Sequence, residues 1–514
     1  MKNNRLTLPL TALLLLLTLA AGSARAAGLE LAVSRSWELK GEQEGALMGY
    51  AVAGAGDVNG DGFDDALIGV SKWDDPDGDI SAGQALLFLG SASGLQGAQV
   101  DEAAWSFVGE NQAAEFGGAL AGGGDFNRDG RDDVLVGSPQ FFSEDLQSYE
   151  GAAYLFLGQD TGTGDAPLAL AWRVESNQKL AYLGKALAIA GDIDNDGDAD
   201  LVIGAPGYER DTDHINEGAI FVIYGDAEIV TPTLTTPFAT GGVVSAQLGS
   251  SVNGAGDVNH DGYADVLVGA PTYDPLSDPA DPESDRITNA GAVFLYYGSA
   301  SGLQPTPGWA LYGDQVEARL GTAASSAGDL NDDGYADIIV GSPSYDAFPH
   351  IDPALAIVNN GRIDIFFGGE SGPGAAPDWS WVHPTAGAGL GIDVAPAGDT
   401  NGDGFPEVLA GAYNLTAEQF EEGAVYAFFG CGCRDGLIAR MVWTVQGNKQ
   451  ETSFGFAVDG AGDVNHDGLN DVLVGAPHFF YTTVQYGMAT LFEGTEQQPF
   501  LYSFFPLILA GSDR

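Results

Sequence analysis

The sequence predicts an all-β protein, and within that class a seven-bladed β-propeller of about four strands per blade. Three observations predict it. One unit recurs seven times, each unit holds about four short apolar runs, and glycine turns separate the runs. Strand-like runs repeated at a period of about 40 to 70 residues are typical of propeller blades. Seven separate domains would need linkers, and a closed ring also removes exposed sheet edges.

The first 26 residues predict a secretory signal peptide. Lys2 and Arg5 form a basic start, residues 8–21 are mostly leucine and alanine, and residues 24–26 fit a cleavage site. The alternative is an uncleaved anchor helix, but the apolar run is shorter than the ~18 residues a spanning helix needs. The sequence therefore divides into signal peptide 1–26, propeller 27–498 and apolar tail 499–514, and predicts a secreted or cell-surface protein.

The charge of the chain restricts its partners. Without residues 1–26 it keeps 16 Lys and Arg against 72 Asp and Glu, a formal charge of −56. Such a chain repels nucleic acid and anionic lipid and attracts cations, so we expect no nucleic-acid partner. Its 11-residue apolar stretch at 500–510 is too short to span a bilayer. Cys431 and Cys433 form no disulfide framework and are interpreted as two thiols or a local disulfide.

Each repeat contains one polar nine-residue motif. Its copies begin 68, 67, 65, 72, 70 and 64 residues apart. We number them copies 1 to 7, at residues 57–65, 125–133, 192–200, 257–265, 329–337, 399–407 and 463–471. A fixed period of this kind indicates a repeat architecture.

The flanks of the motif predict four strands in chain order. The first strand follows a glycine placed eight residues before the motif, and the second is the apolar run directly after it, as in "DVLVGAP". The third is a run such as "GAVFLYYG". The fourth contains an aromatic residue, and these residues are Trp105, Trp172, Phe238, Trp309, Trp381 and Trp443. Short runs of this composition favour strands over helices.

The stretch "FGFAVDGAGDVNHDGLNDVLVGAP" (454–477) resembles the FG-GAP repeat of the integrin α-subunit head. The resemblance covers residues 46 to 494 and implies a seven-bladed propeller with calcium on its loops. Copies 1 and 6 depart from the pattern, because copy 1 reads "LMG" and "GVS" and copy 6 reads "GLG" and "GAY".

The polar motif itself predicts a calcium site. Oxygens at positions 1, 3, 5 and 9 and the backbone carbonyl at position 7 can converge, and Gly at position 6 permits a sharp turn. Hard oxygen donors suit Ca²⁺, whereas zinc prefers nitrogen or sulfur. We expect up to seven structural Ca²⁺ ions.

The predicted ligands are, by copy, Asp57, Asn59, Asp61, Phe63 and Asp65; Asp125, Asn127, Asp129, Arg131 and Asp133; Asp192, Asp194, Asp196, Asp198 and Asp200; Asp257, Asn259, Asp261, Tyr263 and Asp265; Asp329, Asn331, Asp333, Tyr335 and Asp337; Asp399, Asn401, Asp403, Phe405 and Glu407; and Asp463, Asn465, Asp467, Leu469 and Asp471.

Three other kinds of loop have a similar sequence pattern. An EF-hand needs an acid at position 12, where this chain has apolar residues, and a dockerin flanks its loop with helices. A metal-free Asx turn explains one loop, but seven loops that hold three or four carboxylates favour a cation. Copy 6 is the weakest predicted site, because Glu407 is longer than Asp and Pro406 stiffens the approach.

The resemblance implies a binding role, for an extracellular protein or carbohydrate ligand. No catalytic constellation is visible, so we expect no enzyme. Two alternatives are a calcium-dependent polysaccharide lyase or hydrolase, with Lys, Arg, Tyr and acids meeting at the central funnel, and a structural surface-layer component. The long insertions at 274–286 and 345–360 are expected between the second and third strands, where they could contribute to a binding surface.

The ends of the chain predict how the ring closes. Trp37 precedes copy 1 at the place where other tryptophans mark a fourth strand, and copy 7 has none after it. Residues around 31–40 are therefore expected to supply the outer strand of the last blade. The competing solution uses 499–509.

Overall fold

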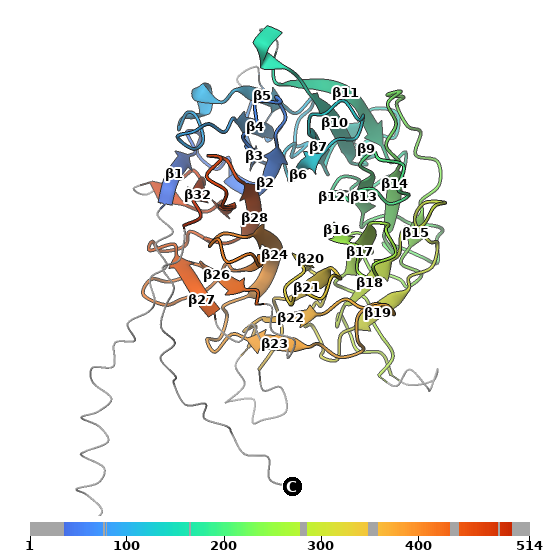
Figure 1. Ribbon diagram of the computed structural model, residues 1–514. Coiled ribbons are helices and arrows are strands. Elements are labelled where there is room, and N and C mark those ends of the chain that lie inside the picture. The colour runs from blue at the N-terminus through green and yellow to red at the C-terminus, as the bar shows by residue number, and fades with distance from the viewer. Residues whose placement is uncertain are drawn as a thin grey trace, which may run out of the picture.

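Seven four-stranded antiparallel sheets surround a central channel, which Figure 1 shows end-on. The computed structural model describes residues 35–75, 78, 80–163, 166–277, 285–347, 358–431, 441–481 and 484–495. The predicted signal peptide and apolar tail lie outside these residues, as do parts of both long insertions. The prediction of a seven-bladed propeller is confirmed.

Each blade is one sheet, with its innermost strand at the channel. The strands, from the inside outward, are β2 (Met48–Gly56), β3 (Asp65–Val70), β4 (Gln84–Phe88) and β5 (Trp105–Val108) in blade 1; β6 (Ala119–Gly124), β7 (Asp133–Ser138), β10 (Ala152–Gly158) and β11 (Leu168–Glu175) in blade 2; β12 (Ala186–Ile189), β13 (Leu201–Ala205), β14 (Ala219–Ile223) and β15 (Ala239–Thr240) in blade 3; β16 (Ser251–Gly256), β17 (Asp265–Ala270), β18 (Ala292–Tyr296) and β19 (Trp309–Tyr312) in blade 4; β20 (Ala323–Gly328), β21 (Asp337–Ser342), β22 (Arg362–Phe366) and β23 (Trp379–Val382) in blade 5; β24 (Leu390–Gly398), β25 (Glu407–Ala412), β26 (Ala424–Phe429) and β27 (Met441–Gln446) in blade 6; and β28 (Ala457–Gly462), β29 (Asp471–Ala476), β32 (Met488–Phe492) and β1 (Arg35–Lys40) in blade 7.

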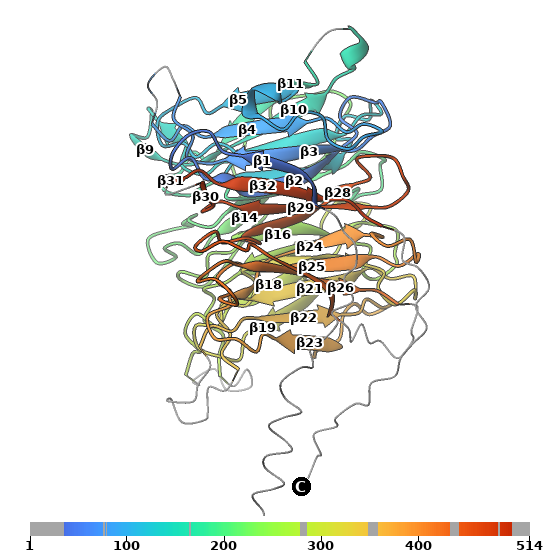
Figure 2. The same ribbon diagram turned by 90° about the vertical axis from the view of Figure 1, so that its left-hand side faces the viewer.

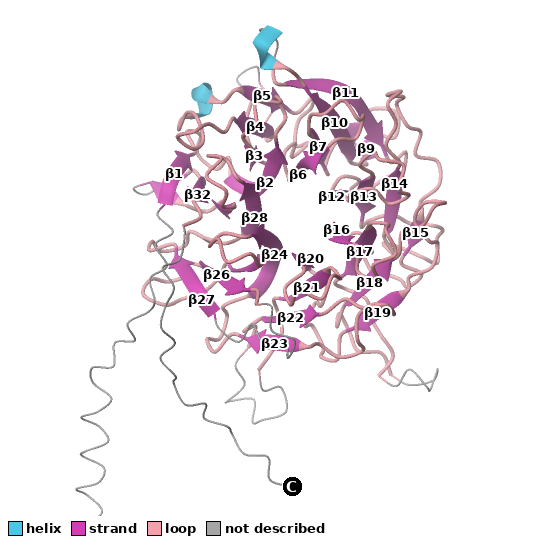
Figure 3. Cartoon of the chain, in the orientation of Figure 1, coloured by secondary structure: helices cyan, strands magenta, loops and turns pink. Residues whose placement is uncertain are grey.

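Other regular structure in the described residues is slight (Figure 3). Two hairpins, β8 (Phe142–Ser143) with β9 (Ser148–Tyr149) and β30 (Phe480–Tyr481) with β31 (Val484–Gln485), lie between the second and third strands of blades 2 and 7. The two single-turn helices are η1 (Val100–Glu102) and η2 (Thr161–Thr163). Within the described part of the chain, no helix has the length and apolar character needed to cross a bilayer.

The hydrophobic core lies between neighbouring blades. Seven clusters of buried side chains fill the seven junctions. The second strand of each blade, such as β17, is buried at every residue because a blade covers each of its faces. This position explains why these strands read as continuous apolar runs rather than alternating ones.

Glycines allow the blades to meet closely near the channel. A Cβ on Gly69 of β3 would overlap the carbonyl oxygen of Gly117 at the start of blade 2, and a Cβ on Gly475 would overlap that of Gly49 at the start of blade 1. The same contact recurs at all seven junctions. The two glycines that recur in each repeat are therefore partners across a junction.

Aromatic side chains join the blades further out. Trp105 of blade 1 packs on Phe156 of blade 2, with 4.8 Å between ring centroids. In blade 5 the equivalent residue is Trp379, which packs on Phe428 at 5.2 Å. Trp381, the aromatic residue predicted for this fourth strand, lies in β23 as expected, but the register places Trp379 opposite the third strand where Trp309 pairs in blade 4.

The two ends of the chain close the ring in blade 7. Strand β1 pairs antiparallel with β32, and Trp37 lies opposite Leu491. Trp37 then packs on Phe88 of blade 1, with 5.0 Å between centroids, and its indole N–H donates to the carbonyl of Gly97. The predicted N-terminal closure is confirmed.

The ring has two faces, seen from the rim in Figure 2. The polar motifs lie on one face, because each connects the end of a first strand to the start of a second. The connections into each first strand, and those between second and third strands, lie on the opposite face. We call these the motif face and the connection face.

Candidate metal centres

All seven polar motifs form similar loops on the motif face. In copy 1, Asp57 at position 1 folds over the loop and accepts N–H groups from Asp61 at 3.0 Å and Gly62 at 2.7 Å. The side chain of Asn59 accepts from Asp61 N–H at 2.8 Å, and that of Asp61 accepts from Phe63 N–H at 3.1 Å. The loop therefore turns the side chains at positions 1, 3 and 5 inward.

The carboxylate at position 9 is buried in every copy. In copy 1, Asp65 Oδ2 accepts from Val58 N–H at 3.1 Å, and Oδ1 accepts from Gly90 N–H at 2.9 Å. The second bond ties the loop to the end of the third strand, 25 residues away. The equivalent donors in copies 2, 3, 4, 5 and 7 are Gly158, Gly225, Gly298, Gly368 and Gly494. The sequence shows a glycine at the end of each third strand, but the hydrogen bond from this glycine to the position-9 carboxylate was not predicted.

Burial makes the position-9 groups hard to ionise without compensation. It raises the pKa of Asp65 to about 8 and that of Asp265 to about 7, and the nearby acids of each loop add to the rise. A cation beside such a group would favour its charged form.

Copy 3 gives the sharpest test of whether a cation fits. Carboxylate oxygens of Asp192, Asp194 and Asp200 lie within 4.8 Å of one another. Asp194 Oδ1 is buried and has no hydrogen-bond partner among the described residues. Burial raises the pKa of Asp194, and the charges of Asp196 and Asp192 raise it further. A buried, uncompensated acid among other acids is unfavourable, and this all-oxygen donor set fits a hard divalent cation.

Copy 6 differs at positions 2 and 9. Glu407 Oε2 accepts from Thr400 N–H at 2.8 Å and Thr400 Oγ1 at 2.7 Å, and its Oε1 accepts from the amide of Asn401 at 2.8 Å. In copy 1 the corresponding amide, that of Asn59, donates to Asp61 instead. The longer acid therefore takes the amide donor of position 3, while the Asn401 carbonyl oxygen still accepts from Asp403 N–H at 2.9 Å.

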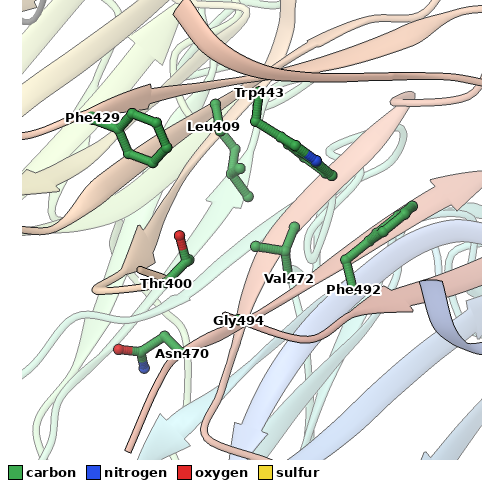
Figure 4. Close-up of a pocket in the computed structure, with 9 residues that line it drawn as sticks. Thr400, Leu409, Phe429, Trp443, Asn470, Val472, Phe492 and Gly494 are labelled. Atoms are coloured by element: carbon green, nitrogen blue, oxygen red, sulfur yellow. The ribbon is translucent and has the colours of Figure 1, made fainter. Parts of the chain in front are cut away.

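A cavity lies beside Thr400. Other copies have a large apolar residue at position 2, namely Val58, Phe126, Ile193, Val258, Leu330 and Val464, all buried. Beside Thr400 a cavity of ≈ 20 Å³ opens between blades 6 and 7, lined by Leu409, Phe429, Trp443 and Phe492 among others (Figure 4).

Sequence reasoning missed the contacts that join one loop to the next. At position 8, Asp132 accepts from Asp57 N–H of the preceding loop at 2.9 Å, and Asp64 accepts from Asp463 N–H at 2.7 Å. Arg128 reaches from copy 2 to copy 3, where it donates to the carbonyl of Asp196 at 2.9 Å. These residues vary between copies, so no repeated pattern could identify them. His260 and His466 are exposed at position 4.

The FG-GAP repeat family matches five segments of this chain, residues 116–156, 184–220, 248–296, 321–366 and 454–492. They lie in blades 2, 3, 4, 5 and 7. The two blades outside these matches hold copies 1 and 6, whose flanking motifs depart from the repeat pattern.

Three known proteins illustrate the similarity. Integrin alpha-3 of Cricetulus griseus is 32% identical over 215 residues, 41% of this chain and 18% of that protein. Phosphatidylinositol-glycan-specific phospholipase D of Bos taurus is 27% identical over 405 residues, 74% of this chain and 46% of the phospholipase. This chain thus matches less than half the length of either relative. A crystal structure of BBS1N in complex with ARL6DN aligns over 89% of this chain with a TM-score of 0.42 and 10% identity, too distant to support an argument.

Proposed function

Because the chain carries five FG-GAP repeats on a seven-bladed propeller similar to those of integrin α subunits, we propose that it is a calcium-stabilised recognition module. It acts outside the cytoplasm, secreted or at a cell surface, and binds an extracellular protein or glycan. Calcium is held by positions 1, 3, 5, 7 and 9 of the loops, where it offsets the clustered carboxylates and fixes each loop. The orphaned oxygen of Asp194 supports this assignment.

The observation that carries recognition is an apolar ring on the connection face. Seven of the eleven exposed large hydrophobic side chains of the described residues lie there, with 46% to 58% of each exposed. The apolar ring consists of Ile80, Leu180, Ile215, Val244, Val316, Val358 and Phe420. Single exposed hydrophobic residues are common, but their concentration on one face is typical of an interaction surface.

The backbone holds this ring in place. The carbonyl of Ile215 accepts from Ser245 N–H at 2.9 Å, and that of Phe420 accepts from Glu451 N–H at 2.8 Å. Each bond joins a connection between second and third strands to the one that leads into the next blade. The exposed side chains therefore stand on a braced surface, which lowers the entropic cost of binding.

A triple variant tests the proposal. We expect Ile80→Ser, Val316→Ser and Phe420→Ser together to weaken binding at least ten-fold on an array of purified matrix proteins and glycans with calcium. The matched control is Leu170→Ser with Val230→Ser, two exposed apolar residues off that face. Equal binding by the triple variant and the wild type would refute the assignment of this face.

A second candidate function is a calcium-dependent polysaccharide lyase or hydrolase. The observation that favours it is the channel, whose lining includes Tyr50, Lys185, Asp393 and Asp459. The Lys185 ammonium lies 5.7 Å from the centroid of the Tyr50 ring. Both acids, however, already accept two backbone N–H groups each and join blades, so we place this function second. Cleavage of a polysaccharide that is lost in Lys185→Met would favour it.

A further inference from the structure

A hollow of ≈ 420 Å³ opens on the connection face where blades 2, 3 and 4 meet. We call it the blade 3 pocket. Its volume lies within the roughly 300–1,000 Å³ typical of small-molecule sites. Polar side chains from three successive blades line it, namely Glu115, Gln140, Tyr182, Lys185, Asn216, Gln247 and Ser250, beside the apolar surfaces of proline and leucine residues.

Within the described part of the chain, five of these polar side chains are unpaired, whereas the Ser250 hydroxyl donates to the Gln247 carbonyl at 2.7 Å and the Lys185 ammonium lies 5.7 Å from the centroid of the Tyr50 ring. Among the described residues, the carboxamides of Gln140, Asn216 and Gln247 have no hydrogen-bond partner, and neither have the Tyr182 hydroxyl and the Glu115 carboxylate. Nearby amides behave differently. Gln178 clamps the backbone of Glu209 with both amide atoms at 2.6 Å. The pocket amides are thus not structural clamps, and they remain available to a ligand.

The backbone beneath them is strained. Glu115, Tyr182 and Gln247 occupy equivalent positions, two residues before the first glycine of their blades, with φ of 52°, 55° and 55°. Residues with side chains rarely adopt this left-handed conformation. Blade 6 has Gly389 at the same position with φ of 64°, so the fold accepts glycine there. Leu47, Arg319 and Ser453 have the same conformation in blades 1, 5 and 7, with φ of 60°, 57° and 51°, so the left-handed backbone belongs to the fold. Around this hollow it fixes the directions of three polar side chains.

The chemistry of these groups favours a saccharide. A carboxamide offers both donors and an acceptor, which matches the donor and acceptor character of neighbouring hydroxyl groups, and the Glu115 carboxylate can accept from a hydroxyl. The ring of Tyr182 provides an apolar face for the C–H side of a sugar. The formal charge of −53 repels anionic glycans at long range.

We propose that the blade 3 pocket binds a neutral saccharide unit of an extracellular glycan. This proposal rests on the recognition function proposed above and names its ligand class. Gln140, Asn216 and Gln247 hydrogen-bond the hydroxyl groups, Glu115 accepts from one of them, and Tyr182 packs against the ring.

The test measures binding of the full chain, in calcium, to cellohexaose, maltohexaose, laminarihexaose, chitohexaose and mannohexaose by saturation-transfer NMR, with oligogalacturonate as the anionic comparison. We expect at least one neutral hexasaccharide to bind. Gln247→Gly and Tyr182→Gly should each weaken it at least ten-fold. Gln247→Gly should not lower the Tm, because glycine relieves the left-handed backbone.

The matched control is Gln315→Ala, which removes an amide that clamps Asp346 on the far side of the face. It should lower the Tm and leave saccharide affinity within two-fold. Failure of all neutral hexasaccharides to bind, or binding that survives Gln247→Gly with Tyr182→Gly, overturns the proposal. A protein ligand lost only in the apolar-ring variant would overturn it while the proposed function stands.

Discussion

At the scale of single residues, copy 6 shows how two substitutions change a loop together. Thr400 has a hydroxyl where other copies have an apolar group, and this hydroxyl donates to Glu407. A cavity lies beside it, and the longer acid occupies the amide of Asn401. The loop of copy 6 and the junction between blades 6 and 7 are therefore altered at the same place.

Restoring both residues should strengthen this blade. We expect Thr400→Val with Glu407→Asp to raise calcium occupancy at copy 6 and to stabilise the protein. Val has no hydroxyl that the shorter acid would leave unpaired, so the double change avoids a buried orphan group. Denaturant titration with and without calcium measures the change in the free energy of unfolding. The reverse change in blade 7, Val464→Thr, should cost about 1–3 kcal/mol, because its buried hydroxyl lacks an acid partner. A loss of stability in the first variant, or a gain in the second, would contradict this account.

Two channel acids predict a pH dependence. Asp393 accepts from Val458 N–H at 2.9 Å and Asp459 from Gly54 N–H at 3.2 Å, so each joins its blade to the next. Burial raises the pKa of Asp393 to about 6, and burial together with the Asp393 charge raises that of Asp459 to about 7.

These raised pKa values determine whether stability rises or falls with pH. The folded protein binds the protons of these two acids more tightly than the unfolded chain does, whose Asp pKa is about 3.9. The two acids therefore stabilise the fold fully below about pH 3.9, and this stabilisation is lost as pH rises through about 7. In saturating calcium, the Tm of the wild type should therefore fall more between pH 5 and pH 8 than that of Asp393→Asn with Asp459→Asn. Lys185 is the cation lining this channel, and Lys185→Met should leave the difference in place. Parallel pH profiles for wild type and double variant would exclude these acids as its source.

At the scale of the element, β1 is the strand on which the ring depends. It is the outer strand of blade 7 although it comes from the other end of the chain. Its Trp37 is buried between β32 and Phe88 of blade 1.

Removing β1 should destabilise the whole propeller. Deletion of residues 27–42 exposes blade 7 and the core of the 7–1 junction, and Trp37→Ala alone should cost about 3–5 kcal/mol, as large core truncations do. Arg35→Ala, an exposed residue of the same strand, is the control and should change stability by less than about 0.5 kcal/mol. Denaturant unfolding measures both. A deletion of 27–42 that unfolds like the wild type would show that closure does not require this strand.

Most of the elements could be predicted, because each repeat shows the same four runs. Trp37 predicted the closing strand, since it matched the fourth-strand position of other units. Trp379 could not be distinguished from Trp381 without the pairing register of β23. Contacts between blades, such as Asp132 with the loop of Asp57, depend on radial packing that no single repeat contains. The blade 3 pocket was missed for the same reason, since the polar residues that line it come from three repeats.

At the scale of the whole molecule, the seven loops form a ring around the motif face. Backbone bonds link them, as when Ala264 N–H donates to the carbonyl of Asp192 in the preceding loop at 3.0 Å. A cation in one loop therefore braces its neighbour as well.

Calcium removal should accordingly affect the whole propeller. If free calcium is ten-fold above Kd, each site adds about 1.4 kcal/mol, and seven sites add about 10 kcal/mol, comparable with the stability of a typical domain. We expect EDTA to lower the Tm strongly and readdition of CaCl₂ to restore it, measured by differential scanning calorimetry. An unchanged Tm, with no calcium found by equilibrium dialysis, would refute metal binding.

The pairing of β1 with β32 also determines how the ring responds to a pulling force. Arg35 lies opposite Phe492, so the two chain ends leave blade 7 side by side. A force that separates the two ends would break the hydrogen bonds between these strands one at a time. The force needed would therefore be small. A load carried between the N-terminal end and a partner on the connection face would instead run along β1, so that the hydrogen bonds of the β1–β32 pair share it. The same pair of strands is therefore expected to resist tension along its axis better than separation of its two ends.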